Sequence, residues 1–75
     1  MQSFDIMLQS SSDIQTFANL VNRYPFTISL RQGRALTDAK SILGIYSLDL
    51  GKPITVEVYS NHALELLEAL EKFAA

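Results

Sequence analysis

Three stretches of the chain alternate between apolar and polar residues with the period of two that is typical of a half-buried strand. They cover residues 4–8, residues 26–31 and, most clearly, residues 54–59. Residues 32–34 contain Gly33 and form a predicted turn, from which residues 35–37 return as a short antiparallel strand. The pattern therefore predicts four strands.

The residues between the first two strands have the spacing of an amphipathic helix from Asp13 to Arg23. Ser12 and Gln15 fit a capping box at its start, and Pro25 is expected to stop it. Apolar side chains recur at i, i+3, i+4 and i+7, which predicts one buried helix face: Ile14, Phe17, Ala18 and Val21.

The chain after residue 59 has the pattern of a final helix. Ser60 or Asn61 is expected to cap it, because both are preferred N-cap types. The charged side chains are expected to face water: Glu65, Glu68, Glu71 and Lys72. The predicted buried stripe is apolar: Ala63, Leu66, Leu67, Leu70, Phe73 and Ala74.

In the stretch 39–48, Lys40 and Ser41 lead into an apolar run, residues 42–48, that is interrupted only by Gly44 and Ser47. This run is too short and too apolar for a solvated surface helix. Ser41 is a preferred N-cap type, and Gly44 allows close approach of another element at a cost in helix propensity. We expect one or two helical turns that begin at Ser41 and end before Asp49. Residues 49–53 then form a turn, as their Gly and Pro indicate.

The predicted order is β-α-β-β-α-β-α within a single domain, residues 1–75. This order fits an α+β open-faced β-sandwich, a four-stranded antiparallel sheet with helices on one face. It also fits a ferredoxin-like βαββαβ unit with an added helix. The periodicity of the sequence does not reveal the order of the strands in the sheet, so it does not choose between these two folds. The first strand lies beside the last in the sandwich, whereas the first and third elements are central in the alternative.

Composition narrows the class of protein. A hydrophobic fraction of 48% with 19% charged residues is typical of a globular domain. The net charge of −2 gives no basic footprint for nucleic acid, and the absence of cysteine excludes disulfides and thiolate metal sites. No apolar run approaches the roughly 20 residues that cross a bilayer, and no signal-peptide pattern is present, so we expect a cytoplasmic protein without membrane insertion.

The segment Lys40-Ser41-Ile42-Leu43-Gly44-Ile45-Tyr46-Ser47-Leu48 resembles the regulatory-serine segment of HPr, the histidine-containing phosphocarrier of the bacterial sugar phosphotransferase system. The usual form in that family is Lys-Ser-Ile-Met-Gly-hydrophobic-Met-Ser-Leu. Six of the nine positions match, and the others are hydrophobic for hydrophobic. HPr-like domains also have this element order at this length, so the resemblance favours the open-faced sandwich.

The resemblance implies a phosphoryl-accepting histidine within Gly-(Ile or Leu)-His-Ala-Arg-Pro-Ala, where the first strand joins the first helix. Here that join, residues 9–14, has no histidine, arginine, proline or glycine. A phosphoserine ester is too stable to donate phosphate readily, and Asp13 would repel an incoming phosphate. His62, the only histidine, is expected in the first turn of the last helix, at the opposite pole. Phosphohistidine transfer by the usual route is therefore not expected.

No other catalytic or ligand-binding motif is present: no acid and base pair, P-loop, zinc spacing or nucleophile elbow. We expect neither enzymatic activity nor a cofactor or metal. A weak candidate for anion binding lies at the start of the first helix, where hydroxyls and free amides converge. Its residues are also ordinary caps: Ser10, Ser11 and Ser12.

Two features of the family remain in the segment around Ser41. Ser41 matches a serine that is phosphorylated by an ATP-dependent kinase in some relatives, although it is equally a simple helix cap. Ile42, Leu43 and Tyr46 match an exposed hydrophobic docking patch. Together with Ile45, these side chains cannot all point inward from two helical turns, although Tyr46 also fits a role in the core.

Three functions follow. The favoured one is an HPr-like regulatory module that binds proteins, either phosphotransferase-system components or a transcription regulator, with Ser41 as its phosphorylation site. The second is a ferredoxin-like regulatory domain that binds a small molecule. The third is an atypical phosphocarrier with an unusual acceptor.

Overall fold

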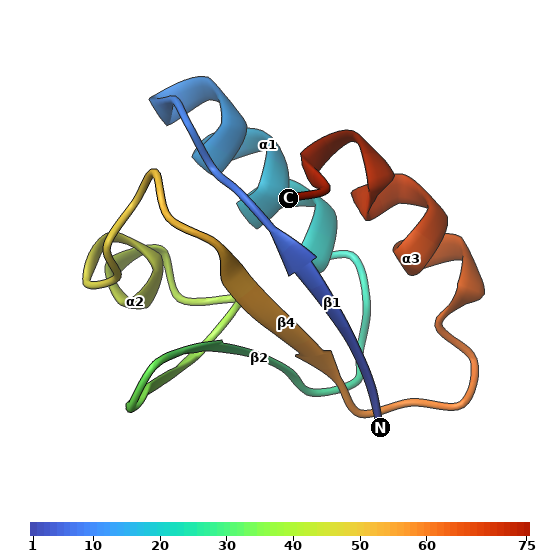
Figure 1. Cartoon of the computed structure of the whole chain (residues 1–75). Helices are drawn as coiled ribbons and strands as arrows, with labels where there is room; N and C mark the ends of the chain where they lie inside the picture. Colours follow the sequence, from blue (N-terminus) through green and yellow to red (C-terminus); the bar gives the residue numbers. More distant parts are fainter.

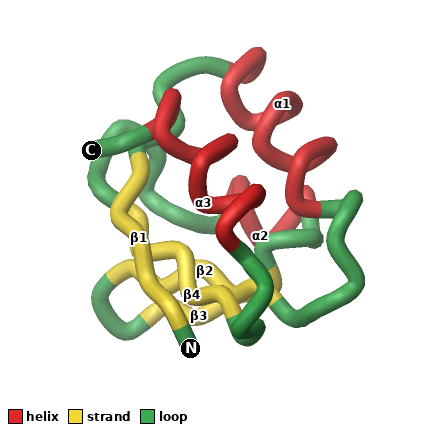
Figure 2. Tube along the Cα trace, turned by 90° about the vertical axis from the view of Figure 1, so that its right-hand side faces the viewer, coloured by secondary structure: helices red, strands yellow, loops and turns green.

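The computed structural model describes residues 1–75, and its centre is an antiparallel sheet of four strands. The strands are β1 (Gln2–Ile6), β2 (Ile28–Gln32), β3 (Ala35–Asp38) and β4 (Ile54–Val58). The helices are α1 (Ser11–Val21), α2 (Ile42–Tyr46) and α3 (Leu64–Leu70), with a 3₁₀ turn η1 (Glu71–Phe73) directly after α3. Figure 2 shows the helices gathered on one side of the sheet.

The strand order is β1-β4-β2-β3. β1 therefore lies at an edge beside the last strand, with Ile6 opposite Ile54 and Gln2 opposite Val58 (Figure 1). This order confirms the open-faced β-sandwich. The ferredoxin-like alternative is wrong, because it requires the first strand to be central.

One hydrophobic core lies between the sheet and the helices. The alternation along β2 and β4 sends Ile28, Leu30 and Val56 into it. Every helix contributes, and Phe17 of α1 meets Phe73 of η1 edge to face, with ring centroids 6.1 Å apart. All four residues of the predicted α1 face are buried: Ile14, Phe17, Ala18 and Val21.

Helix α1 begins and ends two residues earlier than its sequence predicts. Ser10 is the N-cap, and its Oγ accepts from the Asp13 N–H at 3.1 Å. The Asp13 carboxylate accepts from the Gln9 N–H at 3.1 Å, so this pair replaces the predicted Ser12 and Gln15 box at the same spacing. Asn22 ends the helix by donating its side-chain amide to the Ala18 carbonyl, ahead of Pro25.

The last helix also differs from its prediction. Its N-cap is Ala63, without a side-chain hydrogen bond. The Ser60 hydroxyl accepts from the His62 N–H within the preceding loop and does not cap the helix. His62 is thus exposed in that loop rather than in the helix. Ala74 is exposed rather than buried, and its backbone pairs with Ile6 at the edge of β1.

The outer face of the sheet contains one nearly buried carboxylate. Glu57 is 8% exposed, accepts from Arg31 Nε at 3.0 Å, and also accepts from the Tyr59 hydroxyl at 3.3 Å. The hydrogen bond from the Arg31 guanidinium lowers the pKa of Glu57 below its ordinary value of 4.5, against the opposing effect of burial. The ionised form is therefore favoured in the folded state.

A carboxyl whose pKa is lowered by folding stabilises the fold above its unfolded pKa, and this contribution is lost as the pH falls through the folded pKa. We expect Glu57→Gln to reduce the loss of stability below pH 4.5, which urea unfolding at a series of acidic pH values measures. Glu68→Gln, an exposed glutamate without an ion pair, is the control. Equal pH slopes for Glu57→Gln and the wild type would contradict this.

Candidate functional site

The short helix α2 is closed at both ends by serine hydrogen bonds and anchored in the core by one side chain. Ser41 is the N-cap, as predicted, and its Oγ accepts from the Gly44 N–H at 3.1 Å. At the other end the Ser47 hydroxyl donates to the Gly44 carbonyl at 2.6 Å. Ile45 is the only buried residue of α2 and joins the common core.

Gly44 lets α2 approach strand β3 closely. A Cβ atom at this position would collide with the Thr37 side chain and would lie 3.4 Å from the Asp38 carbonyl oxygen. The glycine is therefore required by packing rather than by its backbone angles. This explains why a residue with poor helix propensity stands in so short a helix.

Lys40, directly before the cap, ties this region to the α1–β2 connection. Its ammonium donates to the Phe26 carbonyl at 2.8 Å and to the Tyr24 carbonyl. The lysine is half-buried and lies 14 and 16 residues from these two acceptors. These two hydrogen bonds position the start of α2, and no local pattern in the sequence indicates them.

The loop from α2 to β4 is held by a residue that sequence reasoning placed in a turn. The Gln32 amide donates to the Asp49 carbonyl at 2.9 Å, and its oxygen accepts from the Asp49 N–H at 2.7 Å. It also donates to the Pro53 carbonyl at 3.3 Å. The Gln32 side chain thus forms both a donor and an acceptor hydrogen bond with the loop backbone, as the backbone of a neighbouring strand would. No local pattern in the sequence indicates this contact.

The outward side of α2 is apolar. Leu43 is 79% exposed, Tyr46 52% and Ile42 40%. Apolar side chains exposed together on one small element are typical of interaction sites. We call Ile42, Leu43 and Tyr46 the α2 surface. Tyr46 lies on this surface and does not complete the core.

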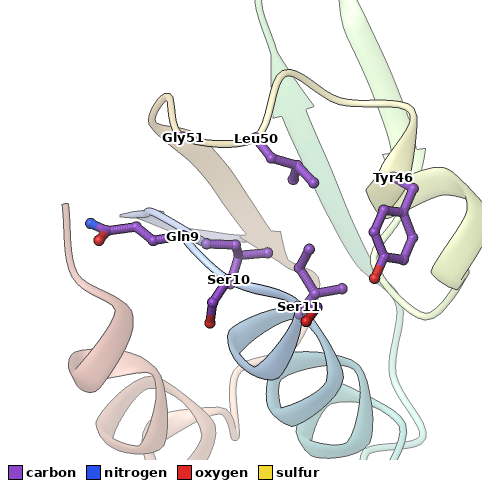
Figure 3. Close-up of a pocket in the computed structure, with 8 residues that line it drawn as sticks. Gln9, Ser10, Ser11, Tyr46, Leu50 and Gly51 are labelled. Atoms are coloured by element: carbon purple, nitrogen blue, oxygen red, sulfur yellow. The ribbon is translucent and has the colours of Figure 1, made fainter.

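A cavity of about 260 Å³ separates the α2 surface from the β1–α1 junction. Leu8, Ile14 and Leu50 form its apolar lining, and Ser11 and Tyr46 lie on opposite sides of it (Figure 3). The remaining lining residues are polar or small: Gln9, Ser10 and Gly51. The cavity joins the two regions singled out by the sequence, residues 9–14 and residues 40–48, into one face.

The three serines at the start of α1 have different surroundings. The Ser10 oxygen is occupied as a cap, Ser11 lines the cavity, and Ser12 is exposed outside it. Asp13 stands beside them, where it would oppose an anion. Anion binding by Ser10, Ser11 and Ser12 stays a prediction.

His62 lies far from this face along the sheet. Because β1 and β4 are antiparallel, the end of β4 lies beside the start of β1. The loop that carries His62 is therefore at the opposite end of the sheet from the β1–α1 junction. The fold does not bring together a histidine and the serines at the start of α1.

Comparison with known families decides what this fold belongs to. The sequence profile described as "PTS HPr component phosphorylation site" matches residues 13–75. The chain belongs to the HPr family of the phosphotransferase system. The matched region begins within α1 and includes the Lys40 to Leu48 segment. No match to a curated protein sequence was found.

Solved HPr structures share the fold over nearly the whole chain. HPr-C-His from Thermoanaerobacter tengcongensis superposes with a TM-score of 0.79 at 19% identity, covering 96% of this chain and 89% of its own. The phosphocarrier protein HPr from Bacillus anthracis has a TM-score of 0.76 at 25% identity, covering 99% and 96%. None of the helices in this HPr-like chain has the length and apolarity needed to cross a membrane.

Proposed function

We propose that this member of the HPr family acts as a protein-binding module of the phosphotransferase system and does not carry phosphate on histidine. The observation behind this proposal is that two regions lie on one face of the molecule, on either side of the 260 Å³ cavity. One region is the apolar α2 surface, and the other is a β1–α1 junction without histidine. Partners that dock on this face would meet apolar side chains and no phosphoryl acceptor.

The residues of the junction support the second half of the proposal. A phosphocarrier needs a nucleophilic nitrogen near neutral pH, which histidine supplies. Residues 9–14 offer only hydroxyls, an amide and the Asp13 carboxylate. The single histidine, His62, lies at the other end of the sheet. The profile match also starts at residue 13 and leaves most of the junction outside.

Exposed apolar side chains support the binding half. Leu43 buries little of its surface in the isolated chain, so a partner that covers it would remove apolar area from water at about 25 cal/mol per Å². Leu50 and the cavity beside Tyr46 extend the apolar area toward α1. Because the chain belongs to the HPr family, the proposed partner is a protein of the phosphotransferase system, such as enzyme I.

The test is a titration of enzyme I into ¹⁵N-labelled protein. The proposal predicts saturable amide shifts in α2, in the residues that line the 260 Å³ cavity and nowhere on the outer face of the sheet. Shifts confined to β3 and the outer face, or no saturable binding of any phosphotransferase-system protein, would refute it.

Phosphorylation of Ser41 is the proposed control of this surface. Its Oγ already accepts from a backbone N–H at the start of α2, so phosphoryl oxygens could accept there as well. The modification adds a charge of about −1.5 to −2 beside the α2 surface. That charge would oppose apolar docking partners and favour basic ones.

We expect incubation with an HPr serine kinase and ATP to add one phosphate, measured by intact mass. Ser41→Ala should abolish the gain, whereas Ser47→Ala, an exposed hydroxyl at the other end of α2, should retain it. No gain in the wild type, or a gain that survives Ser41→Ala, would rule out Ser41 as the site.

A further inference from the structure

A second cavity, of about 220 Å³, is lined by residues of α1, of the turn after it and of η1. Thr16, Asn19, Leu20 and Arg23 line one wall, and Lys72 of η1 lines the other. Thr16, Asn19 and Leu20 are spaced i, i+3 and i+4, so they share one face of α1, and Arg23 follows in the turn directly after the helix. None of these residues belongs to the α2 surface or to the β1–α1 junction.

The charges of this cavity are of one sign. Arg23 and Lys72 are its only charged residues, and neither has a carboxylate within ion-pair distance. The ion pairs of the chain are elsewhere, between Arg31 and Glu57 and between Lys52 and Asp49. Two unpaired cations therefore share one small cavity in a chain whose net charge is −2.

The uncharged residues of the cavity add hydrogen-bond donors. The Asn19 Oδ1 atom accepts from the Gln15 side chain at 3.2 Å, which orients the amide and leaves its NH₂ group able to donate. Thr16 supplies a hydroxyl. With the Arg23 guanidinium and the Lys72 ammonium, the polar groups of the cavity are mainly donors, which suits a ligand rich in acceptor oxygens.

Lys72 is also held in place. Its ammonium lies 5.5 Å from the centroid of the Phe73 ring, and Phe73 packs edge to face against the fully buried Phe17. An ammonium held over a fixed aromatic ring by a cation–π contact loses less freedom when it binds. The cation is thus partly organised before any ligand arrives.

We propose that the cavity between α1 and η1 binds a small phosphate-bearing anion, with Arg23 and Lys72 as its charged contacts and Asn19 and Thr16 as neutral donors. Arginine matches phosphate oxygens in a bidentate way, and a doubly charged anion neutralises both cations. The volume is below the roughly 300 to 1,000 Å³ of pockets for drug-sized ligands, so the occupant is inorganic phosphate or a small phosphate ester. Glu68 and Glu71 are near Lys72 in sequence and weaken the binding, but they do not line the cavity.

The test is an amide-shift titration with sodium phosphate, glycerol 3-phosphate and sodium acetate, each at an ionic strength held constant with sodium chloride. Phosphate should give saturable shifts at Thr16, Asn19, Arg23 and Lys72, at lower concentration than acetate. The tighter of the two phosphate compounds identifies the occupant as the free ion or as an ester. Lack of saturation, or equal affinity for acetate, would overturn the proposal.

Substitutions inside and outside the cavity distinguish binding at this site from a nonspecific attraction of anions to any exposed cation. Arg23→Gln and Lys72→Gln should each weaken phosphate binding about tenfold, as expected for the loss of a hydrogen bond to a charged group. Lys72→Arg keeps the charge and should retain binding. Arg34→Gln, an exposed cation in the β2–β3 turn, should leave it unchanged. Equal weakening by Arg34→Gln would also overturn the proposal.

Discussion

Replacing Ile45 by alanine should lower the free energy of unfolding by about 2 to 5 kcal/mol, the usual cost of truncating a buried isoleucine. Ile45 is fully buried and is the only residue that anchors α2 in the core. A chain of 75 residues is expected to have a total stability of only about 4 to 11 kcal/mol. The variant should therefore be partly unfolded at 37 °C or melt far earlier than the wild type.

The matched control is Leu43→Ala, two residues away in the same helix. Leu43 is 79% exposed, so its truncation should change stability by no more than about 0.5 kcal/mol. Urea unfolding of both variants, followed by circular dichroism, measures the difference. Equal destabilisation by the two substitutions would mean that α2 does not pack as described.

The second large effect concerns binding. Leu43→Asp should weaken the affinity for enzyme I about 100-fold, as expected when a central apolar contact is lost and a carboxylate is desolvated. The fold should survive, because Leu43 is exposed and lies in the first turn of α2, where the helix dipole favours an acidic residue. Isothermal titration calorimetry gives the affinity.

Leu64→Asp provides a control of the same chemistry. Leu64 is 71% exposed at the start of α3, outside the α2 surface and the cavity beside it. Its substitution should leave the affinity for enzyme I unchanged. If it weakens binding as much as Leu43→Asp does, the partner docks elsewhere than on α2.

Much of the fold could be predicted from the sequence, because it depends on strong local patterns. Ile54, Val56 and Val58 alternate within a strand that is central and buried, and Ile14, Phe17 and Val21 repeat at helical spacing. The order of the strands could be predicted only from the resemblance to HPr, since the open-faced sandwich and the ferredoxin-like unit both contain these patterns. The register of β1 beside β4 then decided between them.

Element ends were predicted less well, for a physical reason that the caps illustrate. Two residue pairs have the spacing and chemistry of a cap for α1: Ser10 with Asp13, and Ser12 with Gln15. Which pair caps the helix depends on where strand β1 ends. Ala63 is the N-cap of α3, although Ser60 and Asn61 are of the preferred N-cap types. Packing of Leu66 and Leu70 against the core sets the position of that helix and overrides the preference.

The candidate site was predicted only for residues that lie within one short segment of the sequence. Ser41 and the exposed residues of α2 follow from one short segment of sequence. Gln32, Lys40 and Leu50 were not predicted, because their roles depend on contacts with residues distant in sequence or on lining a cavity between separate elements. The cavity between α1 and η1 was not predicted for the same reason, since Arg23 and Lys72 line one cavity only in the folded chain.

The most direct test of the proposed function is a reaction with phosphoenolpyruvate and enzyme I, followed by intact mass measurement before and after brief acid treatment. A phosphocarrier HPr in the same mixture shows that enzyme I is active. We predict that this carrier gains an acid-labile phosphate, whereas the HPr-like chain of 75 residues gains none and still binds enzyme I. An acid-labile phosphate on this chain would contradict the account, because it would reveal an acceptor that works without a histidine at the β1–α1 junction.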